Sequence, residues 1–325
     1  MTSKATGEQS NDSPQWQCVY KMKMDKRPIK IINSVSELHR LLTLPKPLHP
    51  LITLINHGDI TSAPNQDNER LVLNFYNISI KRSFHGQMKY GKNYYDFDEG
   101  TMSFISPNQV ISIDEDENRN KDGWSLMFHP DLIRNYNLSK TIHNYGFFAY
   151  EVNEALHLSE KEETIIENLI RNIEQEYQSN TDVYSQDVIV SNLELLLNYC
   201  NRFYNRQFVT RKLASNDLLV KFENILATYF NDSIETGLPT VNSLAQELNL
   251  SPSYLSDMLR TATGQNTQQH IHNKLIDKAK DILTTTNLSV GEIAHKLGFE
   301  YPQSFNKLFK NKTTFTPLEY RQSFN

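Results

Sequence analysis

The chain has 325 residues, 38% of them apolar and 22% charged, which is usual for globular protein and leaves core enough for two domains. It has no run of 18 or more apolar residues and no apolar signal core near its polar N-terminus, so we expect no membrane span and no secretion. Residues 221–325 carry ten Lys or Arg and ten Asp or Glu, so the overall charge of −5 arises in residues 1–220 and neither part is strongly basic.

Residues 29–130 hold short segments with β character that are separated by turn residues such as His57-Gly58 and Pro107-Asn108. The segments are 29–32, 51–55, 71–80, 94–97, 102–105, 110–113 and 125–128. Many short strands of this kind predict a sandwich or a barrel. Residues 1–28 before them are polar, and we expect a disordered leader there.

Two helices are predicted after the strands. Ser159 and Glu162 form a capping box that opens the first helix, and a second helix runs from about residue 185 to 204 with a wide apolar face. One part of that face can pack on the β domain while the other pairs with a second copy of the chain; burial within one chain is the alternative. We predict a dimerisation hairpin at 159–204 that uses Ile189, Leu193, Leu196 and Leu197.

A linker is predicted at 205–214. Arg206, Arg211 and Lys212 lie in this region without an acidic neighbour, and they either contact a phosphate or are simply solvated. Cys200, on the apolar face of the preceding helix, is expected to be a buried thiol, because its context differs too much from that of Cys18 for a disulfide.

Two copies of one helix-turn-helix pattern follow, at 241–262 and 290–311. In the second copy, Ser289 and Glu292 form a capping box, Gly298 permits the turn, and Pro302 suits the first position of the next helix. The first copy repeats this pattern at an offset of 49 to 50 residues, with Ser251-Pro252 opening its second helix and Gly264 closing it. A helix of about 19 residues, roughly 28 Å long, is predicted between the copies at 267–285.

The residues of the second copy resemble a known family. Ile293-Ala294-x-x-x-Gly298-Phe299, Phe305-x-Lys307-x-Phe309-Lys310 and Pro317-x-x-Tyr320-Arg321 are similar to the second helix-turn-helix of the AraC/XylS transcription regulators, and the run from Leu248 to Arg260 is similar to the first. Thr314 departs from the glycine that usually ends the family's second recognition helix. Because β-branched residues resist positive φ, we expect that helix end to be capped differently.

The resemblance implies promoter DNA as the partner, with the residues near the start of each recognition helix meeting base edges. One turn of B-DNA spans about 34 Å, so a strut of roughly 28 Å can hold both helices in successive major grooves. The predicted base contacts are Ser253, Tyr254, Ser256, Asp257 and Arg260 in the first unit, and Tyr301, Gln303, Ser304, Asn306 and Lys307 in the second. The predicted phosphate contacts are Lys310, Lys312 and Arg321.

The segment from Gly100 to Gln109, with Met102 and Phe104, resembles the cupin-like N-terminal domain of the same family. No His-x-His pair occurs among the strands, so we predict no metal, no cofactor and no enzymatic activity. The resemblance allows a small effector inside this domain. The aromatic residues that line such a pocket, or else simply fill the core, are Tyr94, Tyr95, Phe97, Phe104 and Trp124.

The sequence therefore predicts an α+β multidomain protein. Its parts are a leader (1–28), a cupin-like β sandwich or barrel (29–158), the helical hairpin, the linker, and an all-α domain with two helix-turn-helix units (215–325). The predicted function is a cytoplasmic, homodimeric, sequence-specific transcription regulator. An RNA polymerase contact and an effector stay open as further partners. The alternatives are a cupin-type enzyme with an accessory helical domain and a helical adaptor that binds only protein.

Overall fold

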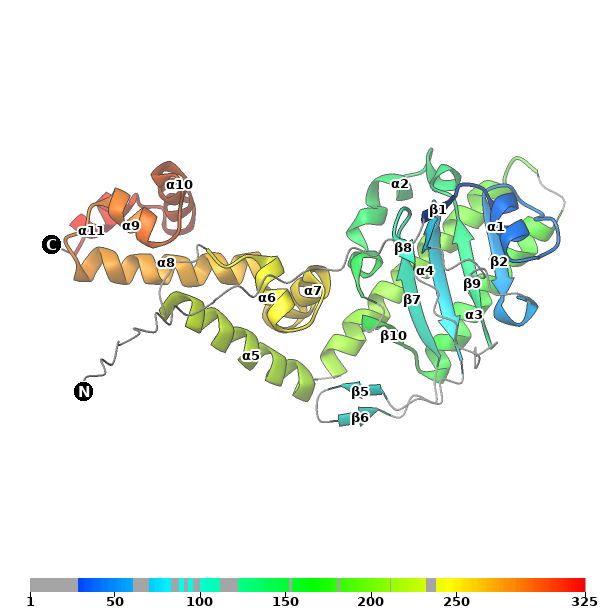
Figure 1. Cartoon of the computed structure of the whole chain (residues 1–325), viewed down its shortest axis with the longest axis horizontal. Helices are drawn as coiled ribbons and strands as arrows, with labels where there is room; N and C mark the ends of the chain where they lie inside the picture. The colour runs from blue at the N-terminus through cyan, green and yellow to red at the C-terminus, as the bar shows by residue number, and fades with distance from the viewer. Residues whose placement is uncertain are drawn as a thin grey trace, which may run out of the picture.

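The computed structural model describes residues 29–60, 70–82, 88–90, 93–95, 100–111, 122–151, 154–179, 182–210, 212–231 and 238–324 (Figure 1). The expected leader lies outside these residues. The strands and helices of the N-terminal part stand at one end of the molecule, and a run of helices leads away from them to the C-terminus. None of the helices in the described ranges combines the length and hydrophobicity that a membrane span needs.

The N-terminal part is built on strands. The strands are β1 (Ile29–Ile32), β2 (Ile52–Asn56), β3 (Arg70–Leu73), β4 (Tyr76–Lys81), β5 (Met88–Tyr90), β6 (Asn93–Tyr95), β7 (Thr101–Ile105), β8 (Val110–Ile111), β9 (Gly123–Phe128) and β10 (Leu156–His157). They form a five-stranded antiparallel sheet in the order β10-β7-β4-β9-β2, a three-stranded sheet β1-β3-β8, and the hairpin β5-β6. The segment predicted at 71–80 is divided between β3 and β4, which belong to different sheets.

Successive side chains of a strand point to opposite sides, so the two faces of the five-stranded sheet enter different cores. On one face Ile78 stands beside Leu126 and Phe104 and joins the core that continues into the helices. Met127, between Leu126 and Phe128, belongs instead to a second core under α1 (Val35–Leu41). Within the described residues the strands do not close into a barrel, so the cupin-like barrel is not confirmed.

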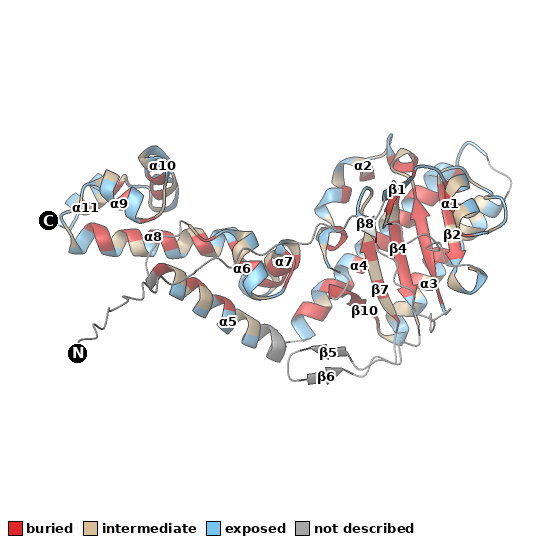
Figure 2. Cartoon of the chain, viewed as in Figure 1, coloured by how far each residue is buried: buried red, intermediate tan, exposed pale blue. Residues whose placement is uncertain are grey.

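The two predicted helices of the hairpin are present as α3 (Glu160–Gln178) and α4 (Ser185–Thr210), packed against each other. The capping box of Ser159 and Glu162 opens α3 as expected. Figure 2 shows buried residues along the central strand β4 and on the helices. The residues predicted to form a dimer interface are all buried within this chain: Ile189, Leu193, Leu196 and Leu197. That assignment was wrong, because these four side chains are buried against α3 and the sheet and cannot reach a second copy of the chain.

The expected linker is largely helical. Helix α4 continues to Thr210, and α5 (Lys212–Asn231), which the sequence analysis did not anticipate, begins two residues later. Arg206 is half-exposed, but its guanidinium is engaged within the chain, because it donates to the Glu162 carboxylate (2.6 Å) and to the carbonyl of His157 (2.7 Å). The chain thus passes from one part to the other with little irregular backbone.

The C-terminal helices follow the predicted plan. They are α6 (Val241–Glu247), α7 (Pro252–Thr263), α8 (Thr267–Thr285), α9 (Val290–Lys296), α10 (Pro302–Thr313) and α11 (Pro317–Gln322). The first unit, α6–α7, and the second unit, α9–α10, both contact α8 through buried side chains, and α5 covers another side of α8. Figure 1 shows the two units toward opposite ends of α8.

The two units share their backbone conformation at two special positions. In the turn between the helices, Asn249 (φ 54°) stands where the second unit has Gly298 (φ 83°). At the end of the recognition helices, Gly264 (φ 77°) corresponds to Thr314 (φ 67°), and each donates its backbone N–H four residues back, to Arg260 and Lys310 respectively. The expectation that Thr314 ends its helix differently was therefore wrong: it adopts the same left-handed cap.

We predict that Thr314→Gly stabilises the chain by about 0.5–1 kcal/mol. A left-handed β-branched residue costs about 1–2 kcal/mol, and the greater freedom of glycine in the unfolded chain offsets part of the gain. The matched control is Gly264→Ala, whose added Cβ would meet no atom within 4 Å, so that the φ of 77° alone should destabilise it by about 1 kcal/mol. Chemical denaturation followed by far-UV circular dichroism measures both; equal stability of wild type and Thr314→Gly would contradict the strain.

Candidate nucleic-acid interface

Helix α10 presents a polar face to solvent. Pro302 occupies its first turn, and Phe305 and Phe309 are fully buried against the rest of the unit. All five residues predicted to meet bases in this unit are exposed: Tyr301, Gln303, Ser304, Asn306 and Lys307. The helix also carries Lys310 and Lys312, both exposed, and no acidic residue. The outward face of α10 is therefore polar and positively charged.

Of the predicted phosphate contacts, Lys310 and Lys312 lie on the surface, but Arg321 does not fit. Its side chain donates to the carbonyl of Leu283 (3.0 Å) at the end of α8 and to that of Leu288 (2.7 Å) just before α9. It is half-buried and ties α11 to the junction of these two helices. The guanidinium is thus occupied by the fold, and the phosphate assignment was wrong for this residue.

Helix α7 is less accessible than α10. Ser253 and Ser256 are half-buried, and the Ser256 hydroxyl lies 3.0 Å from that of Thr267. Arg260 is exposed and donates to Asp257 (2.7 Å), so the aspartate orients this arginine. Tyr254 was expected to point outward, but only 5% of it is exposed. In this conformation it cannot reach a base.

The groups that cover α7 come from the N-terminal part, and the sequence analysis missed them. The Glu154 carboxylate accepts hydrogen bonds from the backbone N–H and the hydroxyl of Ser251, and the Tyr150 hydroxyl donates to Asp257 (2.7 Å). Burial is the larger influence on the Glu154 carboxyl and raises its pKa, while the bonds from Ser251 lower it. Burial and the neighbouring Asp257 carboxylate raise the pKa of Tyr150, so its hydroxyl keeps the proton that it donates. Glu154 lies 97 residues from Ser251 in the sequence, so no local sequence pattern could have predicted that they pair.

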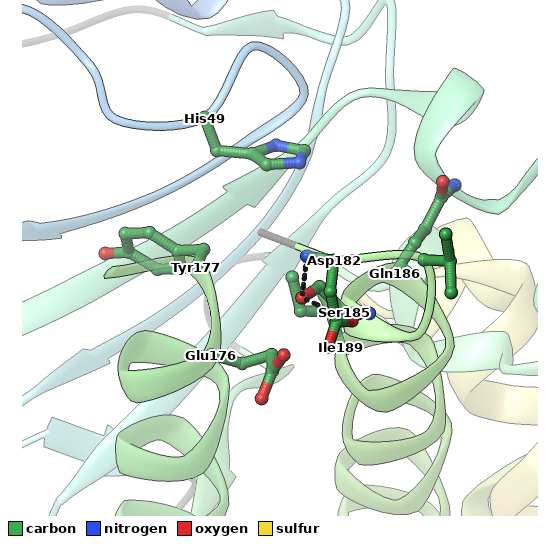
Figure 3. A pocket seen from close by; sticks show the side chains of 8 residues that line it. His49, Glu176, Tyr177, Asp182, Ser185, Gln186 and Ile189 are labelled. Atoms are coloured by element: carbon green, nitrogen blue, oxygen red, sulfur yellow. Dashed lines mark hydrogen bonds between the residues drawn. The ribbon is translucent and has the colours of Figure 1, made fainter. Parts of the chain in front are cut away.

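One cavity of about 260 Å³ lies between the end of α3 and the start of α4 (Figure 3). His49, Glu176, Tyr177 and Gln186 line it, and Asp182 accepts hydrogen bonds from the backbone of Tyr184 and Ser185. Within the described residues no three His, Cys, Asp or Glu side chains are arranged to hold a metal ion. The cavity does not coincide with the expected effector pocket.

The expected effector pocket has no support from the aromatic residues whose side chains are described. Phe104 is buried among Phe147, Phe148 and Tyr204, and Trp124 is also buried, as ordinary core residues are. Phe97, like the side chains of Tyr94 and Tyr95, lies outside what is described.

Residues 244–323 match the family model described as "Helix-turn-helix domain". This match agrees with the resemblance of the C-terminal part of the chain to the AraC/XylS regulators. Among relatives, the raffinose operon transcriptional regulatory protein RafR of Pediococcus pentosaceus is 30% identical over 138 residues, 42% of this chain and 48% of RafR. The arabinose operon regulatory protein of Escherichia coli (strain K12) is 30% identical over 93 residues, 29% of this chain and 32% of that protein. The alignments thus span about half or less of these AraC/XylS-type relatives.

A solved structure also resembles the C-terminal part of the chain. It is the C-terminal domain of the two-component response regulator yesN from Fusobacterium nucleatum, 34% identical, covering 30% of this chain and 96% of that one, with a TM-score of 0.28.

The role of Arg321 can be tested by Arg321→Met, which keeps the apolar stem and removes the donors. Two carbonyls that accept from a charged group would lose their partner, so we expect about 2 kcal/mol of destabilisation in chemical denaturation. The matched control is Lys310→Met, which removes an exposed charge and should change stability by less than about 0.5 kcal/mol. An unchanged unfolding midpoint for Arg321→Met would show that the two bonds do not hold α11.

Proposed function

We propose that the chain is a sequence-specific DNA-binding transcription regulator that inserts α7 and α10 into successive major grooves of promoter DNA. The observation that carries the proposal is the pair of helix-turn-helix units joined by α8, of which the second presents an exposed, lysine-bearing recognition face. The roughly 28 Å of α8 is comparable with one turn of B-DNA, about 34 Å. The two relatives, which are named as regulatory proteins of the raffinose and arabinose operons, support the same function.

The chemistry of α10 suggests its roles on DNA. Gln303 and Asn306 offer the paired donor and acceptor that suit adenine, and Lys307 suits guanine or a phosphate. Lys310 and Lys312 follow toward the end of the helix, where they would position the protein on the backbone without selecting a sequence. In the first unit, Ser253, Ser256 and Arg260 remain the candidates for base contact, with Asp257 orienting Arg260.

We also propose that residues 215–325 act as the DNA-binding domain and that the preceding helices form a homodimer. The predicted dimer residues are buried, but a stripe of other apolar residues is exposed: Val188 (40%) and Leu195 (46%) on α4, and Tyr184 (68%) directly before the helix. Their spacings of four and seven residues place them along one side of the helix, as in a coiled-coil seam. Two copies of α4 meeting along this stripe would give a two-fold dimer.

An effector and an enzymatic activity are not part of the proposal. On the sheet face toward the second core, the Ser79 hydroxyl donates to Asn77 (2.9 Å) and lies 2.9 Å from Ser125, which in turn lies 2.8 Å from His57. These buried polar groups hydrogen-bond to one another and do not require a ligand as a partner. The adaptor that binds only protein is disfavoured by the positive face of α10.

The DNA-binding proposal is tested by selecting duplexes from a random pool with the full-length chain. We expect a motif of two elements about 10 base pairs apart, because successive grooves on one face of the duplex are one turn apart. Asn306→Ala should relax the preference at one position of one element, and Lys307→Ala should weaken binding and its salt dependence. The matched control is Lys161→Ala on α3, an exposed lysine outside both units, which should bind as wild type does. Absence of any enriched motif would contradict the proposal.

The dimer proposal is tested by Leu195→Glu, which places a charge in the exposed stripe of α4. Wild type should sediment as a dimer and Leu195→Glu as a monomer, because a charge at a dry seam must be desolvated without a partner. Val220→Glu on α5 is the matched control, since Val220 is exposed to a similar degree (55%) but lies off the stripe, and it should leave the dimer intact. A monomeric wild type at micromolar concentration would refute this interface.

A further inference from the structure

The N-terminus of α7 is capped by the opposite part of the chain. Glu154 is 2% exposed, and its two carboxylate oxygens accept from the backbone N–H (2.7 Å) and the hydroxyl (2.5 Å) of Ser251, the N-cap residue of α7. Ser251 itself is 3% exposed. A carboxylate at this position also faces the positive end of the helix dipole. The buried Glu154 side chain therefore covers the N-terminus of α7, which is the end that would have to enter a DNA groove.

A second contact holds the outward face of α7 one turn further along. The Tyr150 hydroxyl donates to Asp257, and Asp257 comes so close to Gly146 that a Cβ added there would lie 2.2 Å from its carboxylate oxygen. Gly146 begins the short helical turn η4 (Gly146–Ala149), which packs on α7. Glycine at this position leaves the space that the Asp257 carboxylate occupies.

An aromatic contact lies between the two polar ones. The ring of Tyr254 meets the rings of Tyr150 and Phe208 edge to face, with centroids 5.2 Å and 5.1 Å apart. Phe208 belongs to α4, so two separate elements of the N-terminal part enclose this side chain. At the next turn, the Thr261 hydroxyl donates to Asn205 of α4 (3.3 Å). The contact thus runs from the N-cap through Tyr254 and Asp257 to Thr261.

A recognition helix works by lying in the major groove with its N-terminal residues at the base edges, and a groove about 12 Å wide admits little besides the helix. Helix α7 cannot do this while η4 and α4 cover Ser251, Tyr254 and Asp257. Helix α10 has no such cover among the described residues and stands at the far end of the molecule from the strands (Figure 1).

We propose that these contacts form an autoinhibitory clamp: the N-terminal part holds α7 away from DNA and leaves α10 free. The inference rests on the proposed DNA-binding function. The clamped chain still selects a two-element site, but it must first release α7 from Glu154 and Tyr150, so the clamp lowers its affinity for that site and leaves binding to the α10 element unchanged. The polar contacts of the clamp are hydrogen bonds that water can replace when α7 leaves, and its apolar contact is the Tyr254 ring against Tyr150 and Phe208.

Three substitutions weaken the clamp without altering a side chain that would face DNA. Tyr150→Phe removes the bond to Asp257 but keeps the ring, so it is the variant least expected to disturb folding. Glu154→Gln replaces the charged cap by a neutral amide, and Gly146→Ala pushes the Asp257 carboxylate aside. The matched control for Tyr150 is Tyr145→Phe, because the Tyr145 hydroxyl donates to Asn198 of α4 and not to α7. Glu174→Gln on α3 is the control for Glu154.

The experiment compares full-length proteins on two duplexes recovered by selection, one with both elements and one with the α10 element alone. Each clamp variant should bind the two-element duplex about tenfold more tightly than wild type, within the usual range of coupling between sites, and the one-element duplex equally well. Hydrogen exchange without DNA should show faster exchange in the first turn of α7, at residues 251–255, in the variants but not in the controls.

Three outcomes would count against the clamp. If Tyr150→Phe exchanged faster in α7 than wild type but bound each duplex with the wild-type affinity, the contact would exist without controlling binding. Unchanged exchange in all three variants would show that the contact does not hold α7. Failure of every protein to bind any duplex would instead contradict the proposed function, and the inference would fall with it.

Discussion

The packing of two helix-turn-helix units onto the single helix α8 is the constraint on which the C-terminal part depends. Its buried stripe includes Ile271, Leu275, Ala279 and Leu283, and these side chains sit in one core with Leu255 and Leu259 of the first unit and Ile293 and Phe305 of the second. Because an α-helix is stiff over 19 residues, the distance between the units is set by its length. The separation of α7 and α10 follows from that length and from the faces that the units bury.

Local backbone chemistry made this part predictable. The capping box of Ser289 and Glu292 and the first-turn prolines Pro252 and Pro302 mark helix starts with side chains that act within four residues, so the sequence located α7, α8, α9 and α10 closely. Thr314 was misjudged because propensity is a weak prior: the residue adopts the left-handed cap, and its backbone N–H donates to the Lys310 carbonyl.

Side-chain roles were harder to predict, because they depend on partners far away in the chain. The residues around Arg321 in the sequence do not indicate that it donates to the carbonyls of Leu283 and Leu288. Likewise, the residues around Tyr254 do not indicate that Tyr150 and Phe208 enclose its ring. The wide apolar face of α4 was recognised, but periodicity cannot say whether such a face meets its own chain or another copy. In the N-terminal part, alternation located most strands, while the division of the segment at 71–80 between two sheets lies beyond any period-two pattern.

The two units share one geometry but carry different charge, and this difference explains which of them the N-terminal part can hold. Helix α10 has three lysines and no acid, so burying its face would strip water from several cations that have no acidic partner on the helix. Helix α7 has one acid and one base, Asp257 and Arg260, which already neutralise each other, and its face carries a tyrosine that gains from burial. A carboxylate such as Glu154 can then dock on the neutral helix end without opposing another charge. The same composition that gives α7 less attraction for phosphate makes it the helix that can be covered. In the proposed function, affinity for DNA would therefore rest mainly on α10, and α7 would be the helix that the N-terminal part controls.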